Sequence, residues 1–361
     1  MRKEEEHLAK RYLLFLWLLS SIPFFVGGGA AGQDDAARLH VSVVLVQLNI
    51  AVTDHKGNYI SGLRPEDFAI TEDKIPERTS TFEEGNEPPR RLIDVGPSAG
   101  SHAETPEPSN VPPSADEPTV PGLGFAGANV FVLFDTSNYM YRGFVFAQDA
   151  IADFIRSLEG VSQVALYSYS RNLSRVAPLT SDRSKVLRGV RTTVAGDNAA
   201  LYDCLLMTVK DAAQLTGKKA IVVFSNGPDN SSLMPPEEVA ELDQSTGTII
   251  YMISTRQAEE EPVSTAVFER MSKVTGGKAY FSKSWRDEKQ AFTSIRDDLA
   301  HLYSLSYYPQ PNPNRGWRTI TVKLVGKNLQ NYRIRTRDGY RLLRTQAPAA
   351  TSSGGPESDL K

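Results

Sequence analysis

Uncharged apolar runs of strand length recur through the middle of the chain. The first, NVFVLF at residues 129–134, stops at Asp135. A run of this kind is typical of a strand buried on both faces of a parallel sheet. The later runs that we interpret as strands are Val164–Tyr169, Ser174–Pro178, Ala220–Phe224, Thr248–Ile253 and Ala279–Phe281.

Segments with apolar residues at helical spacing alternate with these runs. They are Phe144–Leu158, Ala200–Leu215, Val263–Val274 and Asp287–Leu302. Alternation of strands and helices predicts the α/β fold class, with a doubly wound, mostly parallel sheet of the Rossmann-like kind wrapped by helices. We place this α/β domain at residues 127–302.

The segments on both sides of this domain have β patterns. Residues 40–84 contain the strand-like stretches Val41–Asp54, Phe68–Ile70 and Thr79–Phe82. Residues 303–345 contain Tyr303–Tyr308, Arg318–Val325 and Asn331–Arg337. Neither segment offers enough strands for a stable sheet of its own. We therefore expect the N- and C-terminal segments to complete one small β module together.

Three further segments lie outside these folded parts. Residues 85–126 are rich in proline, serine and glycine, which predicts an extended linker. Residues 346–361 read as a disordered polar tail. Residues 1–32 have a basic pair, an uncharged apolar run at Tyr12–Val26 and small residues after it, the pattern of a secretory signal peptide.

The N-terminal pattern predicts export to the periplasm, the cell envelope or the medium. The apolar run is shorter than the roughly 20 residues that a membrane span needs. An uncleaved anchor is the alternative, because Glu4, Glu5 and Glu6 weaken the basic flank. We expect no membrane span once the signal is removed.

Net charge and the numbers of cysteine and histidine residues exclude several classes of function. The formal net charge is −3, which gives no electrostatic footprint for nucleic acid. Cys204 is the single cysteine, so an intramolecular disulfide and a cysteine-based zinc site are excluded. The five histidines form no H-E-x-x-H pattern, and a Ser–His or Cys–His nucleophilic site has little support. We therefore expect no enzyme, with a carboxylate-based envelope hydrolase as the remaining enzymatic alternative.

Asp135 and Ser137 are the candidate site residues that the pattern itself indicates. In open α/β sheets, ligands bind just beyond the carboxyl ends of the strands. An Asp and a Ser two residues apart place two hard oxygen ligands on one loop, as a divalent cation such as Mg²⁺ needs. We expect the Asp135 carboxylate to be reachable at this rim.

Several strings in order along the chain carry a family resemblance. They are VLFDTSNYM (132–140), GDNAALYDCL (196–205) and VVFSNGPDNSS (222–232), with GLRPEDFAITED (62–73), SLSYYP (304–309) and RDGY (337–340) outside the α/β domain. The chain resembles von Willebrand factor type A proteins, in particular the exported bacterial group found in acidobacteria. The resemblance covers nearly all of the chain after its signal segment.

The resemblance implies a metal-ion-dependent adhesion site with an altered set of ligands. The family pattern gives D-x-S-x-S on the first loop, Thr on the second and Asp on the third. Asp135 and Ser137 match, and Asn226 stands at the final aspartate. Tyr139 replaces the second serine, and Ala199 stands at the threonine. Mg²⁺ would bind only if Asp135, Ser137 and Asn226 still hold it.

The resemblance implies an exported, non-catalytic protein that acts in protein–protein binding or adhesion. It implies no cofactor other than Mg²⁺ at the altered site. A structural scaffold of the envelope that binds no metal is the alternative. Asp203 and Asp229, near the second and third loops, are expected to be capping or solvent groups instead of ligands.

Overall fold

The structure is a computed structural model that describes residues 45–92, 127–225, 227–254, 262–282 and 285–342. These residues belong to one compact unit, Val43–Lys361. The predicted signal peptide, most of the predicted linker, the tail and Asn226 lie outside the described residues. Within the described ranges, no helix has the length and apolarity to cross a membrane.

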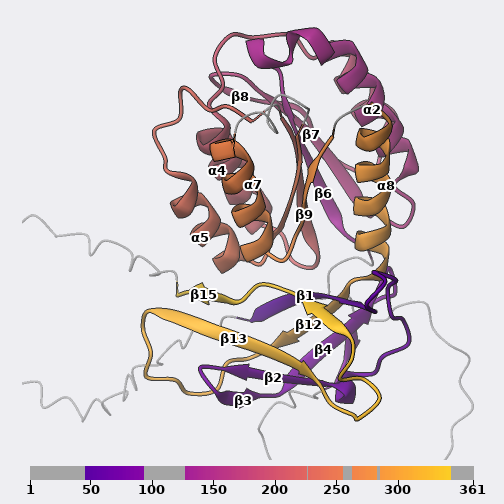
Figure 1. Cartoon of the computed structure of the whole chain (residues 1–361), viewed down its shortest axis with the longest axis vertical. Helices are drawn as coiled ribbons and strands as arrows, with labels where there is room; N and C mark the ends of the chain where they lie inside the picture. The colour runs from indigo at the N-terminus through magenta and orange to yellow at the C-terminus, as the bar shows by residue number, and fades with distance from the viewer. Residues whose placement is uncertain (1–44, 93–126, 226, 255–261, 283–284, 343–361) are drawn as a thin grey trace, which may run out of the picture. The chain divides into compact units, whose positions relative to one another are not determined.

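A six-stranded sheet forms the centre of the α/β domain (Figure 1), with the strand order β11-β10-β9-β6-β7-β8. All neighbours are parallel except β7 and β8, which pair antiparallel. The strands are β6 (Asn129–Asp135), β7 (Gln163–Tyr169), β8 (Leu173–Thr180), β9 (Lys219–Ser225), β10 (Ile249–Ser254) and β11 (Ala279–Phe281). The predicted α/β fold class with a mostly parallel sheet is confirmed.

Helices cover both faces of this sheet. They are α2 (Phe144–Ser157), α3 (Arg183–Thr192), α4 (Leu201–Ala213), α5 (Pro236–Thr246), α7 (Pro262–Val274) and α8 (Trp285–His301). Along β6, Val132 and Phe134 face the core formed with α2 and α8, whereas Phe131 and Leu133 face the core formed with α4 and α7. Both faces of β6 are buried, which explains its uncharged sequence.

The flanking segments form two antiparallel sheets, with the orders β14-β1-β12-β4-β5 and β15-β13-β2-β3. Their strands are β1 (Val46–Thr53), β2 (Phe68–Glu72), β3 (Ile75–Glu77), β4 (Thr79–Glu84), β5 (Arg90–Arg91), β12 (Tyr303–Tyr307), β13 (Trp317–Leu324), β14 (Arg333–Arg335) and β15 (Gly339–Arg341). β12 lies between β1 and β4, and β13 pairs with β2. Both sheets contribute side chains to one apolar core. The prediction of a β module built from both ends of the chain is therefore confirmed.

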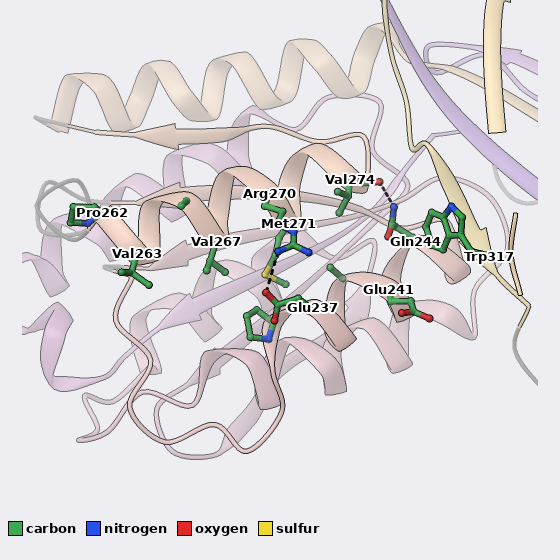
Figure 2. Close-up of a pocket in the computed structure, with 13 residues that line it drawn as sticks. Glu237, Glu241, Gln244, Pro262, Val263, Val267, Arg270, Met271, Val274 and Trp317 are labelled. Carbon is green, nitrogen blue, oxygen red and sulfur yellow. Dashed lines mark hydrogen bonds and ion pairs between the residues drawn. The ribbon is translucent and has the colours of Figure 1, made fainter. Parts of the chain in front are cut away.

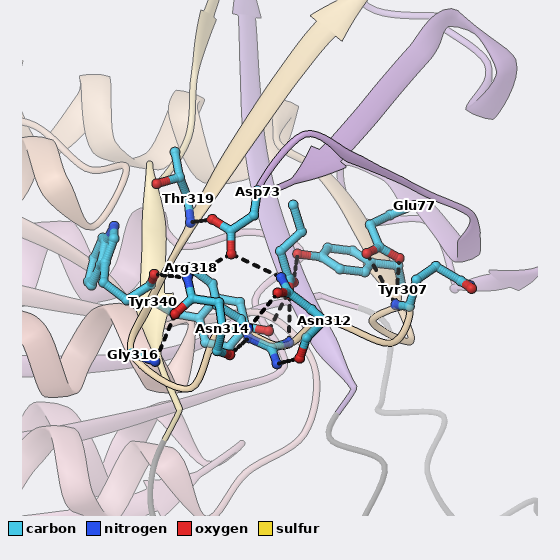
Figure 3. A network of polar contacts seen from close by, with 12 residues as sticks. Asp73, Glu77, Tyr307, Asn312, Asn314, Gly316, Arg318, Thr319 and Tyr340 are labelled. Atoms are coloured by element: carbon cyan, nitrogen blue, oxygen red, sulfur yellow. Dashed lines mark hydrogen bonds and ion pairs between the residues drawn. The ribbon is translucent and has the colours of Figure 1, made fainter.

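Three of the strings outside the α/β domain meet in one buried polar network (Figure 3). Glu72 is fully buried and accepts hydrogen bonds from the hydroxyls of Tyr307 and Tyr340, both at 2.9 Å. Its other oxygen pairs with Nη1 of Arg318 at 2.6 Å. The segments 62–73, 304–309 and 337–340 each supply one member of this network. Their residue types are explained by the need to satisfy a buried carboxylate.

Two helices were not predicted from the sequence, α3 and α5. α3 reads RSKVLRGVRT and buries only Val186, Gly189 and Val190. α5 begins with Pro236 and two glutamates and buries few apolar residues. Their apolar stripes are too narrow to stand out from the surrounding polar sequence.

Candidate functional site

Three loops meet at the carboxyl end of β6. The backbone N–H of Asn138 donates to the carbonyl of Asp197 at 2.7 Å, and Gly196 N–H donates to Thr136 O at 2.7 Å. The N–H of Asn230 donates to Ala199 O at 3.0 Å. The loops that follow β6 and β9 and the loop that precedes α4 therefore form one rim.

Asp135, the last residue of β6, lies beneath this rim with an exposed fraction of 0 %. Its Oδ1 accepts the backbone N–H of Ser137 at 2.8 Å, and its Oδ2 accepts the Ser225 hydroxyl at 2.8 Å. The expectation that this carboxylate is reachable from the rim is wrong. The loop folds back over the strand end, because the carboxylate binds an amide of its own loop.

Sequence reasoning missed the two residues that support Asp135. The hydroxyl of Tyr169 donates to Ser225 Oγ at 3.0 Å, and the Ser225 hydroxyl in turn donates a hydrogen bond to Asp135 Oδ2. The N–H of Gly227 also donates to Ser225 Oγ at 3.1 Å. Tyr169 and Ser225 are the last residues of β7 and β9, the two neighbours of β6. A search for polar residues that end adjacent buried strands would have found them.

Burial sets the electrostatics of this chain of hydrogen bonds. It raises the pKa of the Asp135 carboxyl above its usual range, although hydroxyl and amide donors oppose the shift. Burial and the nearby Asp135 charge likewise raise the pKa of the Tyr169 hydroxyl. No Lys or Arg pairs with Asp135 among the described residues. The carboxyl group is thus held by neutral donors alone.

The other positions of the implied metal site do not supply a shell of ligands. Ala199 is fully buried and offers no side-chain oxygen, and its N–H donates to Asn230 Oδ1 at 2.9 Å. The hydroxyl of Tyr139 accepts from Asn230 Nδ2 at 3.3 Å. The buried Ser137 hydroxyl has no hydrogen-bond partner among the described residues, so it is the one side-chain oxygen left over.

Of the three implied ligands, the structure describes only Asp135 and Ser137, and Asn226 lies outside the described residues. Mg²⁺ needs octahedral oxygen coordination with some carboxylate charge. Each oxygen of Asp135 accepts one hydrogen bond, and the side chain of Ala199 offers no oxygen, so the described positions give a small ligand set. In the described part of the chain, no group of three or more His, Cys, Asp or Glu side chains could hold a metal ion.

Asp203 and Asp229 hold two loops together by reciprocal hydrogen bonds. Asp229 Oδ2 accepts the N–H of Tyr202 in the first turn of α4 at 3.1 Å. In return, Asp203 accepts the N–H groups of Leu233 and Met234 at 3.0 and 2.9 Å. Negative charge at a helix N-terminus is favourable. Asp229 is therefore a capping group, one of the two expected roles, whereas Asp203 binds amides of the loop that precedes α5.

Exposed apolar side chains occur on the loops of this rim and on the first turns of the helices that follow them. They are Tyr141, Val145, Phe146, Val194, Leu233 and Val263, with exposed fractions of 54, 62, 68, 79, 92 and 78 %. The first three follow β6, Leu233 follows β9, and Val263 begins the helix after β10. Since β6, β9 and β10 are adjacent, these side chains rise from one edge of the sheet.

A second apolar feature lies between α5 and α7 (Figure 2). A groove of about 580 Å³ runs between the two helices, with Trp317 at one end. Its walls carry Val267, Met271 and Val274, and Glu237 pairs with Arg270 across it at 3.3 Å. A groove of this size can take a peptide side chain or a small apolar ligand.

The residues that could act as nucleophiles are in inert surroundings. Cys204 is buried, and burial raises the pKa of its thiol to about 12. A thiol must ionise to react, so this one is a packing residue. His301 stacks on Tyr59 with ring centroids 5.0 Å apart, and its Nδ1 lies 2.6 Å from Asp297 O.

Comparison with solved structures gives several likenesses at low identity. BatB of Bacteroides thetaiotaomicron is 14 % identical, with 48 % of this chain and 97 % of that chain covered and a TM-score of 0.41. A von Willebrand factor type A protein of Catenulispora acidiphila is 12 % identical, with 56 % and 64 % covered and a TM-score of 0.42. The vWF domain of the type V pili tip protein Mfa5 of Porphyromonas gingivalis is 13 % identical, with 48 % and 95 % covered and a TM-score of 0.41.

No curated protein matches the chain. The family model of the von Willebrand factor type A domain matches residues 129–294. This range begins at β6 and ends within α8, and so takes in the whole parallel sheet and its helices. The chain therefore contains a von Willebrand factor type A domain.

Proposed function

We propose that this protein is an exported, non-catalytic binding protein whose von Willebrand factor type A domain holds a protein partner on the apolar rim. Domains of this family are generally interaction modules. The observation that carries the proposal is the set of six exposed apolar side chains on loops and helix N-termini at one edge of the sheet. Buried apolar and aromatic anchors supply most of the energy in protein interfaces.

Hydrogen bonds between the loops make the rim a rigid surface for binding. Its loops are tied to one another by backbone hydrogen bonds and by the side chains of Asp203 and Asp229. Asp135, Ser225 and Tyr169 brace the strand ends below. A loop that is already ordered loses less entropy when a partner binds. Phe146 and Leu233 can therefore contribute as preformed anchors.

We propose that binding at this rim needs no divalent cation. The support is the buried, hydrogen-bonded state of Asp135 together with Ala199 at the threonine position. Calorimetric titration with Mg²⁺ and Mn²⁺ should give no binding heat beyond dilution. Heat that disappears in an Asp135→Ala variant would instead assign a functional metal site to Asp135, Ser137 and Asn226.

The test of partner binding compares rim variants with a matched control. Phe146→Ser and Leu233→Ser each remove one exposed apolar group from the rim. Val325→Ser does the same on the β module, where Val325 is 54 % exposed. Proteins of the envelope fraction that co-purify with the chain are quantified by mass spectrometry. The proposal expects a partner whose yield falls about tenfold for both rim variants, as loss of an anchor predicts.

One outcome of this experiment would count against the rim. Equal yields for rim and control variants would place the binding surface elsewhere. The groove between α5 and α7 is then the next candidate and would fit a scaffold role. Met271→Gln, which changes the groove floor, separates these two surfaces.

Export rests on the N-terminal sequence pattern. N-terminal sequencing of the protein from the envelope or medium should give a chain that begins near residue 33. A chain that retains its N-terminus in the membrane fraction would support the uncleaved anchor.

A further inference from the structure

Basic residues are concentrated at one end of the parallel sheet. Residues 171–191 contain six basic residues, Arg171, Arg175, Arg183, Lys185, Arg188 and Arg191, and a single acidic residue, Asp182. The whole chain, by contrast, has a formal net charge of −3. This segment covers the edge strand β8 and helix α3.

Half of these basic residues are neutralised or bonded locally, and Arg171, Lys185 and Arg188 are not, among the described residues. Arg175 pairs with Asp211 at 2.6 Å, and Arg191 pairs with Asp149 at 2.7 Å. Arg183 donates to Val161 O at 2.7 Å. Lys185 and Arg188 are exposed, and no acidic side chain in the described part of the chain pairs with either of them.

Two of these three cations, Lys185 and Arg188, line the same cavity. It measures about 400 Å³ and lies between β8 and α3, with Lys185 and Arg188 on the helix side. Val176, Ala177, Pro178, Leu179 and Thr180 of β8 form the other wall. No carboxylate lines it, because the nearest acidic residue in sequence, Asp182, caps the helix by accepting the N–H groups of Ser184 and Lys185.

The local sequence holds this cavity in shape. Residues 185 and 188 are three apart, so they share one face of α3. Val186 and Val190 are buried on the opposite side. Gly189 lets the helix approach β8, because a Cβ there would lie 3.2 Å from Val176 Cγ1. A larger residue at 189 would push the helix away and widen the cavity.

We propose that this cavity binds an acidic, extended peptide segment of a partner protein. The planar guanidinium of Arg188 matches a carboxylate in two-point contact, and the Lys185 ammonium adds a second positive charge. Val176, Pro178 and Leu179 give an apolar wall beside these charges. A peptide in which carboxylates flank an aliphatic side chain uses both features, whereas a simple phosphate would use only the charges.

This site is separate from the proposed rim and does not depend on it. Thr180 pairs with Val164, near the start of β7, so the cavity lies toward the amino end of the parallel strands. The rim lies at their carboxyl end. The two surfaces could therefore hold different partners, or two parts of one partner.

The experiment measures fluorescence anisotropy of a labelled peptide that alternates glutamate and leucine, titrated with the full chain. The double variant Lys185→Gln with Arg188→Gln should weaken binding about tenfold or more, since charge-assisted contacts are lost. The matched control, Arg171→Gln with Lys323→Gln, removes the same net charge from exposed positions outside the cavity. It should change the dissociation constant by less than about twofold, because exposed charges at a distance are screened.

Further variants, a control peptide and competition with phosphate test which kind of ligand the cavity binds. Lys185→Glu should weaken binding more than Lys185→Gln, and thermal melts should show that each exposed variant stays folded. The peptide with glutamine in place of glutamate should not bind. Equal loss in the double variant and its control, or no binding of the acidic peptide at low salt, would overturn the proposal. Inorganic phosphate that displaces the peptide at similar concentration would reassign the cavity to small anions.

Discussion

The two ends of the parallel sheet differ in the partners of their buried charged side chains. At the carboxyl rim, Asp135 is buried among neutral donors, and apolar side chains face outward. At the amino end, Lys218 is buried and pairs with Glu83 of β4 at 2.7 Å. Asp298 of α8 is fully buried and pairs with Arg335 of β14. At the amino end, these two buried charges are thus neutralised by the flanking β segments.

This difference indicates which end is already an interface. Asp298 also accepts the hydroxyls of Tyr59 and Tyr251, at 2.7 and 2.5 Å, so it joins the β module to β10 of the α/β domain. Each partner there comes from the same chain. At the rim, the exposed apolar groups have no such cover among the described residues. We therefore assign the part of the amino end that contacts β1, β4 and β14 to internal attachment, and the rim to an external partner.

The largest effect is expected from breaking the attachment at Asp298. Asp298→Ala leaves Arg335 and two tyrosine hydroxyls without their acceptor, and removing one member of a buried ion pair costs about 3–5 kcal/mol. Urea denaturation should show this loss in the free energy of unfolding. The control Asp297→Ala removes an exposed carboxylate paired with Arg296 and should cost under about 0.5 kcal/mol. Similar losses in both variants would contradict the assignment of Asp298 as the attachment point.

A smaller effect is expected at the rim from Asp135. Asp135→Ala leaves Ser137 N–H and the Ser225 hydroxyl without an acceptor, at a cost of about 2–3 kcal/mol. Asp135→Asn keeps one acceptor and removes the buried charge, so it should lose less stability. Chemical denaturation of both variants separates bracing from metal binding. A stability loss for Asp135→Ala that appears only when Mg²⁺ is present would refute the brace.

Removing the Asp229 cap at the rim should reduce the stability by a smaller amount. Asp229→Ala removes the acceptor for Tyr202 N–H and for two N–H groups of its own loop, and loss of a cap costs about 1–2 kcal/mol. Hydrogen exchange should speed up in the first turn of α4 and in residues 231–234. Unchanged exchange there would show that the loops are held in another way.

The smallest effect is a pH dependence at the amino end. Burial lowers the pKa of Lys219 to about 8. Between about pH 8 and pH 10 the folded protein has lost this proton, while the unfolded chain, with a lysine pKa of about 10.4, retains it. The free energy of unfolding should therefore rise with pH, by about 1 kcal/mol between pH 8 and pH 9. Lys219→Met should remove this rise, and an identical pH profile in the variant would refute it.

The sequence was sufficient for the parts of the fold that rest on strong apolar patterns. The runs that became β6, β7, β9 and β10 are uncharged and buried on both sides, and the helices α2, α4, α7 and α8 have broad apolar faces. α3 and α5 were missed because most of their surface is polar. The pairing of both chain ends into one module was predicted from the shortage of strands in each segment.

The position of the candidate site was predicted correctly, but the burial of its carboxylate was not. The end of an apolar strand located Asp135 correctly at the carboxyl end of the sheet. Its burial could not be predicted, because it depends on Ser225 and on the loop of Ser137 folding over it. Those contacts involve residues 90 positions apart in one case, which no local pattern encodes.

The most direct test of the account is the affinity of the rim partner measured with and without divalent cations. Once the partner is identified, its dissociation constant is determined by calorimetry in excess EDTA and again in Mg²⁺. The account predicts values within about twofold of each other, both weakened about tenfold by Leu233→Ser. Binding that requires Mg²⁺ and is insensitive to Leu233→Ser would contradict it.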